Sequence, residues 1–506
     1  MKKSFVFAGL VCVAVVAVVF VLFSDRQSEP TITQLKPTEI IELQNGDTFD
    51  LTASMVNKEI NGQVYEMLAY NGSIPGPVLK VAQGAEITVH FKNETKMETT
   101  IHSHGVRLDN AYDGVPHMTQ EAVQPGESFE YKLRFPDAGM YWYHPHVRED
   151  YQQELGLYGN YWVLPSEAGY WSEVNREIPL FIDDILIERG QIRLSEARAD
   201  HTLMGRYGNV FLINGETDYT LDVSKGEVIR IFFTNAANTR PFKLAIPGAR
   251  LKIVGADGGA YEQEFFAESV VLAPSERAIV HVLFDKPGIA TLQNITPEKT
   301  YTLGSFHVSE SPIATSYDKE FGYAKTQASI SSSIDAYRPF FNSAPDKRIV
   351  LTIDMGAGMM GGHAGHMMSM GTSADGIEWN DTNGMMNAMS NTDTLTWIAR
   401  DEQTGKQNMD IDWQFKRGEP VKIRIFNDPD SMHPMQHPIH FHGQRFLVVS
   451  RDGIAQSNLV WKDTVLIAAG ETVDIVLDTT NPGEWMAHCH IAEHLEAGMM
   501  FGFTIR

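Results

Sequence analysis

Short runs of alternating hydrophobic and polar residues recur along the chain, separated by turns rich in glycine, proline and asparagine. A typical run is Glu86-Ile87-Thr88-Val89-His90-Phe91, and few segments have the three-to-four-residue spacing of an amphipathic helix. Alternation places one face of a strand in a core and leaves the other face polar. The pattern therefore predicts an all-β protein built from β-sandwiches.

One strand pattern returns three times at equal length, which is the mark of an internal repeat. The copies are GAEITVHFKN at residues 84–93, GEVIRIFFTN at 226–235 and GEPVKIRIFN at 418–427. A second set of landmarks has one spacing in all copies and opens beside a glutamate: Gly126 to Gly139, Ser275 to Gly288 and Gly470 to Gly483. Two patterns that agree at three places indicate three related domains.

The length of 506 residues suits three domains, because one domain takes roughly 150 residues. We expect domains at residues 36–165, 166–312 and 347–506, joined by a Ser/Ala-rich linker at 313–346. The middle copy has Gln293 at the position where the outer copies have His144 and His488. We therefore expect the middle domain to be a spacer without metal ligands.

The N-terminus has the pattern of an export segment. Lys2 and Lys3 precede an uncharged run from Phe5 to Phe23, which predicts a signal peptide or membrane anchor within residues 1–30. No small-x-small cleavage site ends the run, so the sequence favours an uncleaved anchor in the inner membrane. The two lysines would keep the N-terminus in the cytoplasm and place the rest of the chain in the periplasm or another extracytoplasmic space.

Charge and cysteine content narrow the function further. The formal net charge of −23 argues against a nucleic-acid partner, because phosphate binding needs a basic surface, and it favours cationic substrates. Only two cysteines are present, and Cys12 lies inside the N-terminal apolar run. An internal disulfide is therefore not expected.

Four His-x-His pairs are the strongest chemical signal in the chain. They are His102 with His104, His144 with His146, His440 with His442, and His488 with His490. Side chains two apart on a strand point to the same face, so each pair can offer two imidazoles to one place. Two pairs come from each outer domain. Packing the first domain against the third would gather eight imidazoles, enough for several metal ions.

Cys489 lies between His488 and His490, so the strand pleat directs its thiol to the opposite face. His437, His494 and Met499 are its candidate partners. One thiolate, two imidazoles and a distant thioether form the ligand set of a blue-copper electron-transfer centre. The backbone around Cys489 would then join this centre to the histidine cluster as a short electron path.

These four motifs, in this order and across all three repeats, resemble those of the multicopper oxidases: laccases, ascorbate oxidases and bacterial cuprous oxidases. The resemblance implies three consecutive cupredoxin-like Greek-key β-sandwich domains that bind four copper ions. The implied ligands are His437, Cys489, His494 and Met499 for a type 1 copper, His102 and His440 for a type 2 copper, and two type 3 sets: His104, His144 and His490, and His146, His442 and His488.

The resemblance also implies a reaction. A reductant gives single electrons to the type 1 copper through His437 or His494, Cys489 passes them on, and dioxygen is reduced to two waters at the cluster. Oxygen reduction consumes protons, and Asp113 in AYDGVP matches the proton-relay aspartate of the family. The alternative for Asp113 is a turn residue before Gly114.

Two other carboxylate positions of the family are compared with this chain: one differs and one matches. Bacterial family members often have a glutamate directly after the second type 1 histidine, where this chain has Leu495. Glu493 or Glu496 could substitute, or either could be a surface or supporting residue. Asp463 in WKDTV resembles another position of the family, for which we expect a structural role.

The third domain contains a methionine-rich insertion at residues 355–389, in which glycine dominates the other positions. Thioether is a soft ligand suited to Cu(I), and bacterial cuprous oxidases have such insertions in the corresponding domain. The candidate ligands for substrate Cu(I) are Met355, Met359, Met360, Met367, Met368 and, two residues before His437, Met435. His433 stands where the family has an aspartate. The alternative is a low-complexity loop without ligands.

The sequence therefore leads to the hypothesis of an exported oxidase that oxidises Cu(I) with dioxygen and contributes to copper tolerance. A laccase that oxidises phenols and a ferroxidase that oxidises Fe(II) are alternatives within the same family. A copper-storage or scaffold protein without turnover is an alternative of another class, against which the complete ligand set argues.

Overall fold

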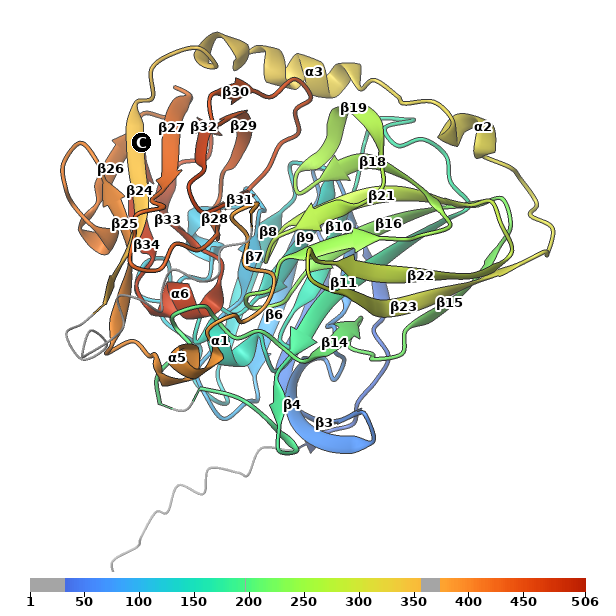
Figure 1. The fold of residues 1–506 in the computed structure, drawn as a ribbon, viewed down its shortest axis with the longest axis horizontal. Coiled ribbons are helices and arrows are strands. Elements are labelled where there is room, and N and C mark those ends of the chain that lie inside the picture. The colour runs from blue at the N-terminus through green and yellow to red at the C-terminus, as the bar shows by residue number, and fades with distance from the viewer. Residues whose placement is uncertain (1–31, 196, 356–373) are drawn as a thin grey trace, which may run out of the picture.

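The computed structural model describes residues 32–195, 197–355 and 374–506. Nearly all of the regular structure consists of strands, arranged as three pairs of packed sheets that follow one another in blue, green and orange to red (Figure 1). The predicted all-β fold is confirmed. The predicted N-terminal signal or anchor helix lies outside the described residues. Within the described ranges, no helix has both the length and the apolar character needed to span a membrane.

The first pair of sheets carries the first two histidine motifs. One sheet has the order β1-β3-β6-β8, with β4 paired to β3, and the other has the order β2-β5-β10-β9-β7. The strands are β1 Ile32–Thr33, β2 Ile40–Leu43, β3 Thr48–Ile60, β4 Gln63–Tyr70, β5 Val78–Ala82, β6 Glu86–Asn93, β7 His102–His104, β8 Ser128–Arg134, β9 Gly139–His144 and β10 Gly159–Leu164. Their facing side chains form one hydrophobic core.

The second pair of sheets has the orders β14-β11-β16-β21-β18-β19 and β15-β23-β22-β17-β20, with a small β12-β13 ribbon beside them. The strands are β11 Arg176–Ile185, β12 Ile187–Glu188, β13 Gln191–Ile192, β14 Val210–Ile213, β15 Thr220–Ser224, β16 Glu227–Asn235, β17 Phe242–Ala245, β18 Arg250–Ala256, β19 Gly259–Ala267, β20 Val270–Leu272, β21 Arg277–Phe284, β22 Gly288–Ile295 and β23 Thr300–Ser309.

The third pair of sheets has the orders β25-β24-β27-β32-β29-β30 and β26-β34-β33-β28-β31. The strands are β24 Lys347–Met355, β25 Leu395–Asp401, β26 Asp412–Phe415, β27 Val421–Asn427, β28 His437–Phe441, β29 Arg445–Arg451, β30 Ile454–Ala455, β31 Thr464–Ile467, β32 Thr472–Asp478, β33 Gly483–Cys489 and β34 Met500–Ile505. Their core contains Cys489 and Met499.

Short helices lie in the connections. They are α1 Glu149–Gln152, α2 Asp318–Phe321, α3 Ala328–Asp335, α5 Gly384–Met389 and α6 Ala492–Glu496, with 3-10 turns η1 Asn110–Tyr112, η2 Arg338–Phe340 and η3 Asn408–Asp410. The segment with α2 and α3 runs along the edge of the second pair of sheets towards the third (Figure 1). The exact domain boundaries expected from the sequence stay a prediction.

The repeated strand has the same place in all three pairs of sheets. β6, β16 and β27 each pair parallel with one neighbour and antiparallel with the other. The asparagine that ends each copy explains why it recurs. The side-chain amide of Asn93 donates to the carbonyls of Met97 and Val123, and Asn235 and Asn427 each make two such bonds in their own sheets. In each repeat the asparagine side chain therefore links the end of the strand to backbone carbonyls of neighbouring segments through buried hydrogen bonds.

Candidate metal centre

The four His-x-His pairs lie on or directly after four strands of the first and third pairs of sheets: β7 carries His102 and His104, while β9, β28 and β33 carry His144, His440 and His488, and His146, His442 and His490 follow those strands. His102 on β7 is directly opposite His144 on β9, and His440 on β28 is directly opposite His488 on β33. The two halves then interlock, because the ring of His104 stacks on that of His440 with centroids 3.7 Å apart. Eight imidazoles therefore form one cluster between two domains, as the sequence predicted.

Seven ring nitrogens of this cluster are buried and have no hydrogen-bond partner. They are Nε2 of His102, His144, His146 and His440, Nδ1 of His104, and both ring nitrogens of His490. Seven of the eight histidines are buried almost completely, and the side chain of His146 is 6% exposed. Buried polar atoms are normally hydrogen-bonded, so this many unpartnered nitrogens in one place indicate a ligand.

His442 and His488 show what kind of ligand fits. Nδ1 of His442 bonds to the Asp113 carboxylate at 2.9 Å, and Nδ1 of His488 donates to the Cys489 carbonyl at 2.9 Å. Their Nε2 atoms, 3.0 Å apart, are then two lone-pair acceptors that face each other. Only a positive charge makes that approach favourable, so the cluster fits metal cations.

Burial and neighbouring imidazoles keep most of these rings neutral. Burial is the largest cause, and the surrounding histidines add to it; together they lower the pKa of His104, His144, His146, His440, His442 and His490, and bring that of His488 to about 4. Neutral imidazole is the form that binds metals. The cluster is thus ready to bind them at neutral pH.

A second, separate set of ligands surrounds Cys489. Its Sγ is 3.5 Å from Nδ1 of His437 and 3.8 Å from Nδ1 of His494, and these two nitrogens are 3.3 Å apart. Met499 is buried and lines the same small cavity as Cys489. The structure therefore brings together the sequence-predicted thiolate and imidazoles, with the predicted thioether beside them.

Trp397 covers this second centre. Its ring centroid is 4.3 Å from that of His494 and 4.8 Å from that of His437, and its indole N–H donates to the Thr202 carbonyl at 2.7 Å. Burial raises the pKa of the Cys489 thiol. A thiolate in such apolar surroundings needs a cation beside it, and a soft thiolate with two imidazoles suits copper.

Carboxylates flank the cluster on two sides. Asp113 accepts from His442 through Oδ2, while its buried Oδ1 accepts no hydrogen bond and lies 3.3 Å from Nδ1 of His102. Asp463 is 3.0 Å from Nε2 of His104 through Oδ1, and Arg277 of the middle domain binds both of its carboxylate oxygens. The sequence pointed to Asp113, gave Asp463 a structural role, and did not indicate Arg277.

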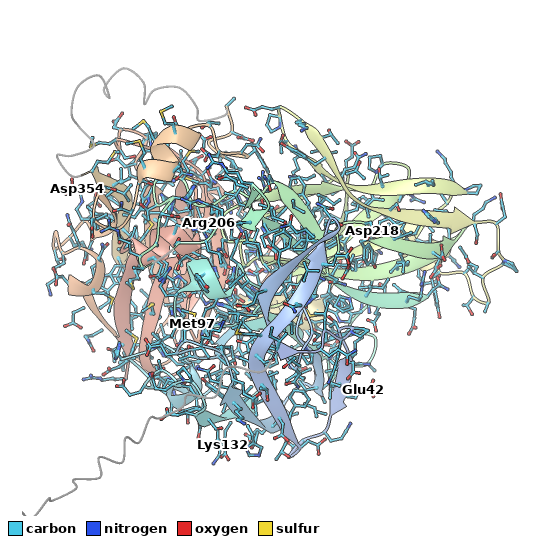
Figure 2. All side chains as sticks on the ribbon, turned by 90° about the horizontal axis from the view of Figure 1, so that it is seen from below. Glu42, Met97, Lys132, Arg206, Asp218 and Asp354 are labelled. Carbon is cyan, nitrogen blue, oxygen red and sulfur yellow. The ribbon has the colours of Figure 1, made fainter. Side chains whose placement is uncertain are left out.

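A buried acidic group lies beside α1 and α6, which contact each other. The Oε1 atom of Glu149 is 3.4 Å from Nε2 of His146, and burial raises the pKa of Glu149. Glu493 is fully buried, hydrogen-bonded to Thr239 and paired with Arg206 at 3.3 Å. Figure 2 shows Arg206 near the middle of the molecule. Glu493 is thus part of an interior network and not a surface residue.

The candidate ligands for substrate Cu(I) fall into two groups. Met359, Met360, Met367 and Met368 lie outside the described residues. Met355 ends β24 and is buried, and Met435 is fully buried in the core that contains Cys489. The structure therefore places both Met355 and Met435 in the buried core that contains Cys489. Their role as ligands stays a prediction.

Comparison with known proteins agrees with this geometry. Three family models described as multicopper oxidase match residues 52–168, 187–307 and 378–506. Multicopper oxidase mco of Staphylococcus aureus is 25% identical over 448 residues, which cover 87% of this chain and 84% of that protein. Copper resistance protein A of Escherichia coli is 24% identical over 90% of this chain and 92% of its own length. Laccase-15 of Oryza sativa is 24% identical, with 86% of each chain covered.

Among solved structures, a multi-copper oxidase from Pseudomonas thermotolerans superposes with a TM-score of 0.67 at 25% identity, covering 92% of this chain and all of that one. The family models together match well over half of the chain. The chain therefore belongs to the multicopper oxidases, and it is a copper-dependent oxidoreductase that uses dioxygen as its electron acceptor.

Proposed function

We propose that the histidine cluster binds three copper ions and that the Cys489 centre binds a fourth. The ligands would be His437, Cys489, His494 and the distant Met499 for a type 1 copper; His102 and His440 for a type 2 copper; and His104, His144, His490, His146, His442 and His488 for a type 3 pair. The unpartnered inward nitrogens support this assignment. Bound copper would supply the one-electron chemistry that couples oxidation of a reductant to reduction of dioxygen.

The chain's own residues connect the two centres. Cys489 faces one centre while its covalent neighbours His488 and His490 face the other, so the path between the centres consists of bonded atoms of adjacent residues. His437 and His494 lie against Trp397, which excludes water from this side of the centre. The thioether of Met499 would be a weak ligand, which would give a moderate redox potential.

The reaction also needs protons, and Asp113 is placed to supply them. Reducing one dioxygen to two waters takes four electrons and four protons. Asp113 is buried, its Oδ2 is held by His442, and its Oδ1 accepts no hydrogen bond and lies 3.3 Å from Nδ1 of His102. Through this oxygen Asp113 would take up and release protons beside the cluster.

For the reductant we favour Cu(I). In the balanced reaction four Cu(I) ions each lose one electron, and dioxygen with four protons becomes two waters. The methionines of α5 and of the loop before His437 carry this choice. Met385 and Met389 of α5 are exposed, Met432 is partly exposed, and Met386 packs against the core that contains Cys489. Apolar side chains are usually buried, and thioethers suit soft Cu(I).

Two further observations support Cu(I). His433, one residue after Met432, is buried with Nε2 unpartnered, and burial lowers its pKa to about 4, so it is a neutral imidazole at physiological pH. The net charge of −23 attracts cations.

The similarity to copper resistance protein A of Escherichia coli supports a contribution to copper tolerance. We propose export from the cytoplasm, by a cleaved signal or an anchor at residues 1–30, from the N-terminal sequence alone.

The test replaces Met385, Met389 and Met432 together by leucine, which keeps their size and removes the sulfur. We expect the rate of Cu(I) oxidation at low Cu(I) to fall roughly tenfold, about the loss of one weak ligand contact of 1.4 kcal/mol, while oxidation of a phenol is unchanged. Met409, exposed on η3 in the same domain, gives the matched control Met409→Leu. Cys489→Ser should abolish both activities and the blue absorption.

The two alternative functions, laccase and ferroxidase, predict different results in the same experiment. A phenol-oxidising laccase would lose no Cu(I) activity in the triple variant and would turn over phenols faster than Cu(I), and the similarity to Laccase-15 of Oryza sativa supports that alternative. A ferroxidase would turn over Fe(II) fastest. Unchanged Cu(I) kinetics in the triple variant would remove the cuprous-oxidase proposal and leave the copper oxidase itself intact.

A further inference from the structure

The outward nitrogens of the cluster histidines are held in two different ways. Nδ1 of His102, His144, His440 and His488 bonds to a backbone carbonyl, at 2.8 to 2.9 Å. His104 is turned the other way: its Nε2 is 3.0 Å from the Asp463 carboxylate and 3.1 Å from the Thr464 hydroxyl, which itself donates to Asp463, and its Nδ1 faces the cluster. A backbone carbonyl is fixed by the strand, whereas a carboxylate can change rotamer. The orientation of His104 therefore depends on what holds Asp463.

Asp463 is held mainly by one residue from a different domain. Its Oδ1 accepts from Arg277 Nη1 at 2.8 Å and from the Thr464 hydroxyl at 3.0 Å, and its Oδ2 accepts from Arg277 Nη2. This bidentate geometry fixes the plane as well as the position of a carboxylate. Both side chains are almost completely buried. Arg277 therefore determines where the Asp463 carboxylate lies.

Arg277 also joins all three pairs of sheets. It begins β21 in the middle pair, its Nε donates to the Met140 carbonyl of β9 at 3.0 Å, and its guanidinium holds Asp463 beside β31. Its backbone N–H donates to Asp257 at 2.8 Å. Burial opposes its charge, but Asp463 and Asp257 more than offset this and raise the pKa of Arg277. The guanidinium thus stays charged where the three domains meet.

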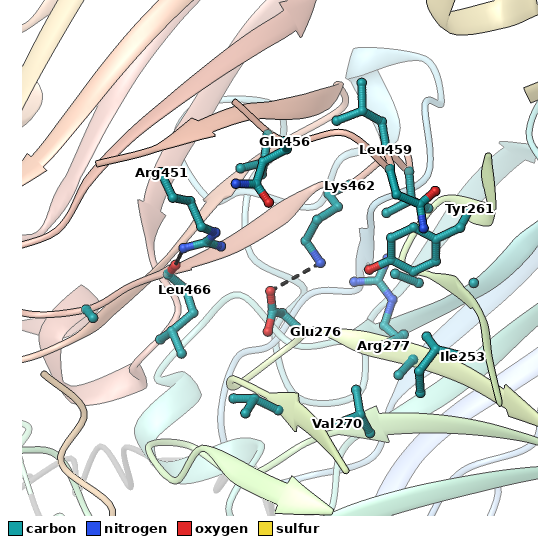
Figure 3. Close-up of a pocket in the computed structure, with 18 of the residues that line it drawn as sticks. Ile253, Tyr261, Val270, Glu276, Arg277, Arg451, Gln456, Leu459, Lys462 and Leu466 are labelled. Atoms are coloured by element: carbon teal, nitrogen blue, oxygen red, sulfur yellow. Dashed lines mark hydrogen bonds and ion pairs between the residues drawn. The ribbon is translucent and has the colours of Figure 1, made fainter. Parts of the chain in front are cut away.

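A cavity of about 430 Å³ lies next to this contact, between the second and third pairs of sheets, and Arg277 is among its lining residues (Figure 3). Lys462, also in its wall, pairs with Asp257 at 3.0 Å and with Glu276 at 3.2 Å. A shorter side chain at position 277 would let water from this space reach the Asp463 carboxylate. The carboxylate would then be free to turn away from His104.

We propose that Arg277 is a positioning residue of the oxygen-reducing cluster, contributed by the domain that has no ligands. It fixes Asp463, and Asp463 orients His104 so that Nδ1 faces the metal. The cluster would thereby form correctly only when all three domains are docked. This inference rests on the proposed copper assignment of the cluster. Removing residues that orient a metal-binding histidine typically costs about 10- to 100-fold in metal affinity or activity.

The experiment compares Arg277→Gln with Arg240→Gln in the full chain. Arg240 is a matched control, because it is equally buried, pairs with Asp184, and donates to the Trp379 carbonyl across the same two domains without touching a cluster histidine. Copper affinity is measured by chelator competition, the cluster by electron paramagnetic resonance, and the Cys489 centre by its blue absorption. Oxygen uptake gives kcat and KM for dioxygen.

For Arg277→Gln we expect about 10- to 100-fold weaker copper binding by the cluster, a changed paramagnetic spectrum, and a lower kcat, with the blue absorption retained. Arg277→Lys should recover part of the loss. Asp463→Asn should act in the same way, and the double variant should be no worse than the single ones, since both residues act through one contact. Arg240→Gln should lower thermal stability only.

The proposal is overturned if Arg277→Gln leaves the cluster spectrum and copper affinity unchanged, or if Arg240→Gln changes them equally. Should Arg277→Gln fail to fold, the milder Arg277→Lys and Asp463→Asn carry the same comparison. A wild-type chain whose cluster binds no copper would instead contradict the copper assignment, which separates the two failures.

Discussion

The outer and middle domains have one scaffold and opposite roles. β9 and β33 each begin at a glycine and carry histidines on the inner face, whereas β22 begins at the equivalent Gly288 and has Gln293 at the matching position. The central strand also differs. β6 of the first domain alternates between buried and more exposed residues, every residue of β16 is buried, and β27 of the third domain is intermediate, with no exposed residue.

The middle domain differs from the outer two in the contacts that it makes with its neighbours. The outer face of β16 is covered, since Phe232 packs against Trp162 of the first pair of sheets with ring centroids 5.1 Å apart. Arginines of the middle domain reach both neighbours: Arg277 contacts Met140 and Asp463, and Arg240 contacts Trp379. The middle domain, for which we propose no metal ligands, therefore contributes interfaces that hold the two outer domains together.

The largest effect should come from making an outer domain resemble the middle one. In His144→Gln one unpartnered inward nitrogen of the cluster is lost, so we expect copper binding by the cluster and oxygen uptake to fall by about 100-fold or more. The matched change Gln293→Ala in the middle domain should leave both unaltered and shift the unfolding free energy by about 0.5 kcal/mol or less. Metal analysis and oxygen consumption check this pair; equal losses would show that the two positions are not functionally different.

A smaller difference between the outer and middle domains is expected in how acid affects the stability of the copper-free protein. His488 has a pKa of about 4 in the folded chain and about 6.5 when unfolded. The unfolded chain therefore binds the proton first, and stability that is complete above about pH 6.5 is lost as the pH falls towards 4, by roughly 3 kcal/mol for this residue. The other cluster histidines with lowered pKa act in the same direction.

Hydrogen exchange of the copper-free protein between pH 7 and 5 measures where this loss occurs. After correction for the intrinsic exchange rate, protection should be lost first in β7, β9, β28 and β33, and later in β16 and β21, because among the described histidines of the middle sheets only His281 has a lowered pKa. Copper should suppress the change, since bound metal competes with protons for the same nitrogens. Uniform loss in all three domains would contradict a cluster origin.

The smallest effect on function is expected where the domains are most alike. Asn235→Ala removes two buried hydrogen bonds to the carbonyls of Arg240 and Leu272, so we expect roughly 2 to 4 kcal/mol of destabilisation with an unchanged copper spectrum. Asn427→Ala should destabilise equally and also shift the blue absorption, because its partner is the carbonyl of Met435, two residues before His437. Denaturant unfolding and absorption spectra test both; a spectral shift in Asn235→Ala would weaken the comparison.

Much of the site could be predicted because the chemistry depends on short spacings. A strand pleat alone places both members of a His-x-His pair on one face and Cys489 on the other. Arg277 was beyond such reasoning, since its partners Met140 and Asp463 lie far from it in the chain. One signal was present: Arg277 occupies the position after the repeated glutamate, where the outer copies have Ser128 and Thr472.

Other residues show the same limit. Glycine and methionine around Met355 suggested a loop, yet Met355 is the buried last residue of β24, because strand pairing with β25 continues to that position. The role of Glu493 also depends on residues from other domains, Thr239 and Arg206. Sequence spacing cannot show such contacts when the partners are hundreds of residues apart.

The sequence by itself determined the strand class, the threefold repeat and the residues able to bind copper, because alternation and His-x-His spacing act over a few residues. The tertiary structure decided which nitrogen of each imidazole faces the cluster, which residues hold Asp113 and Asp463, and how the middle domain takes part. Those properties depend on burial and on charges brought together from three domains, and a side chain acquires them only when its distant neighbours have packed around it.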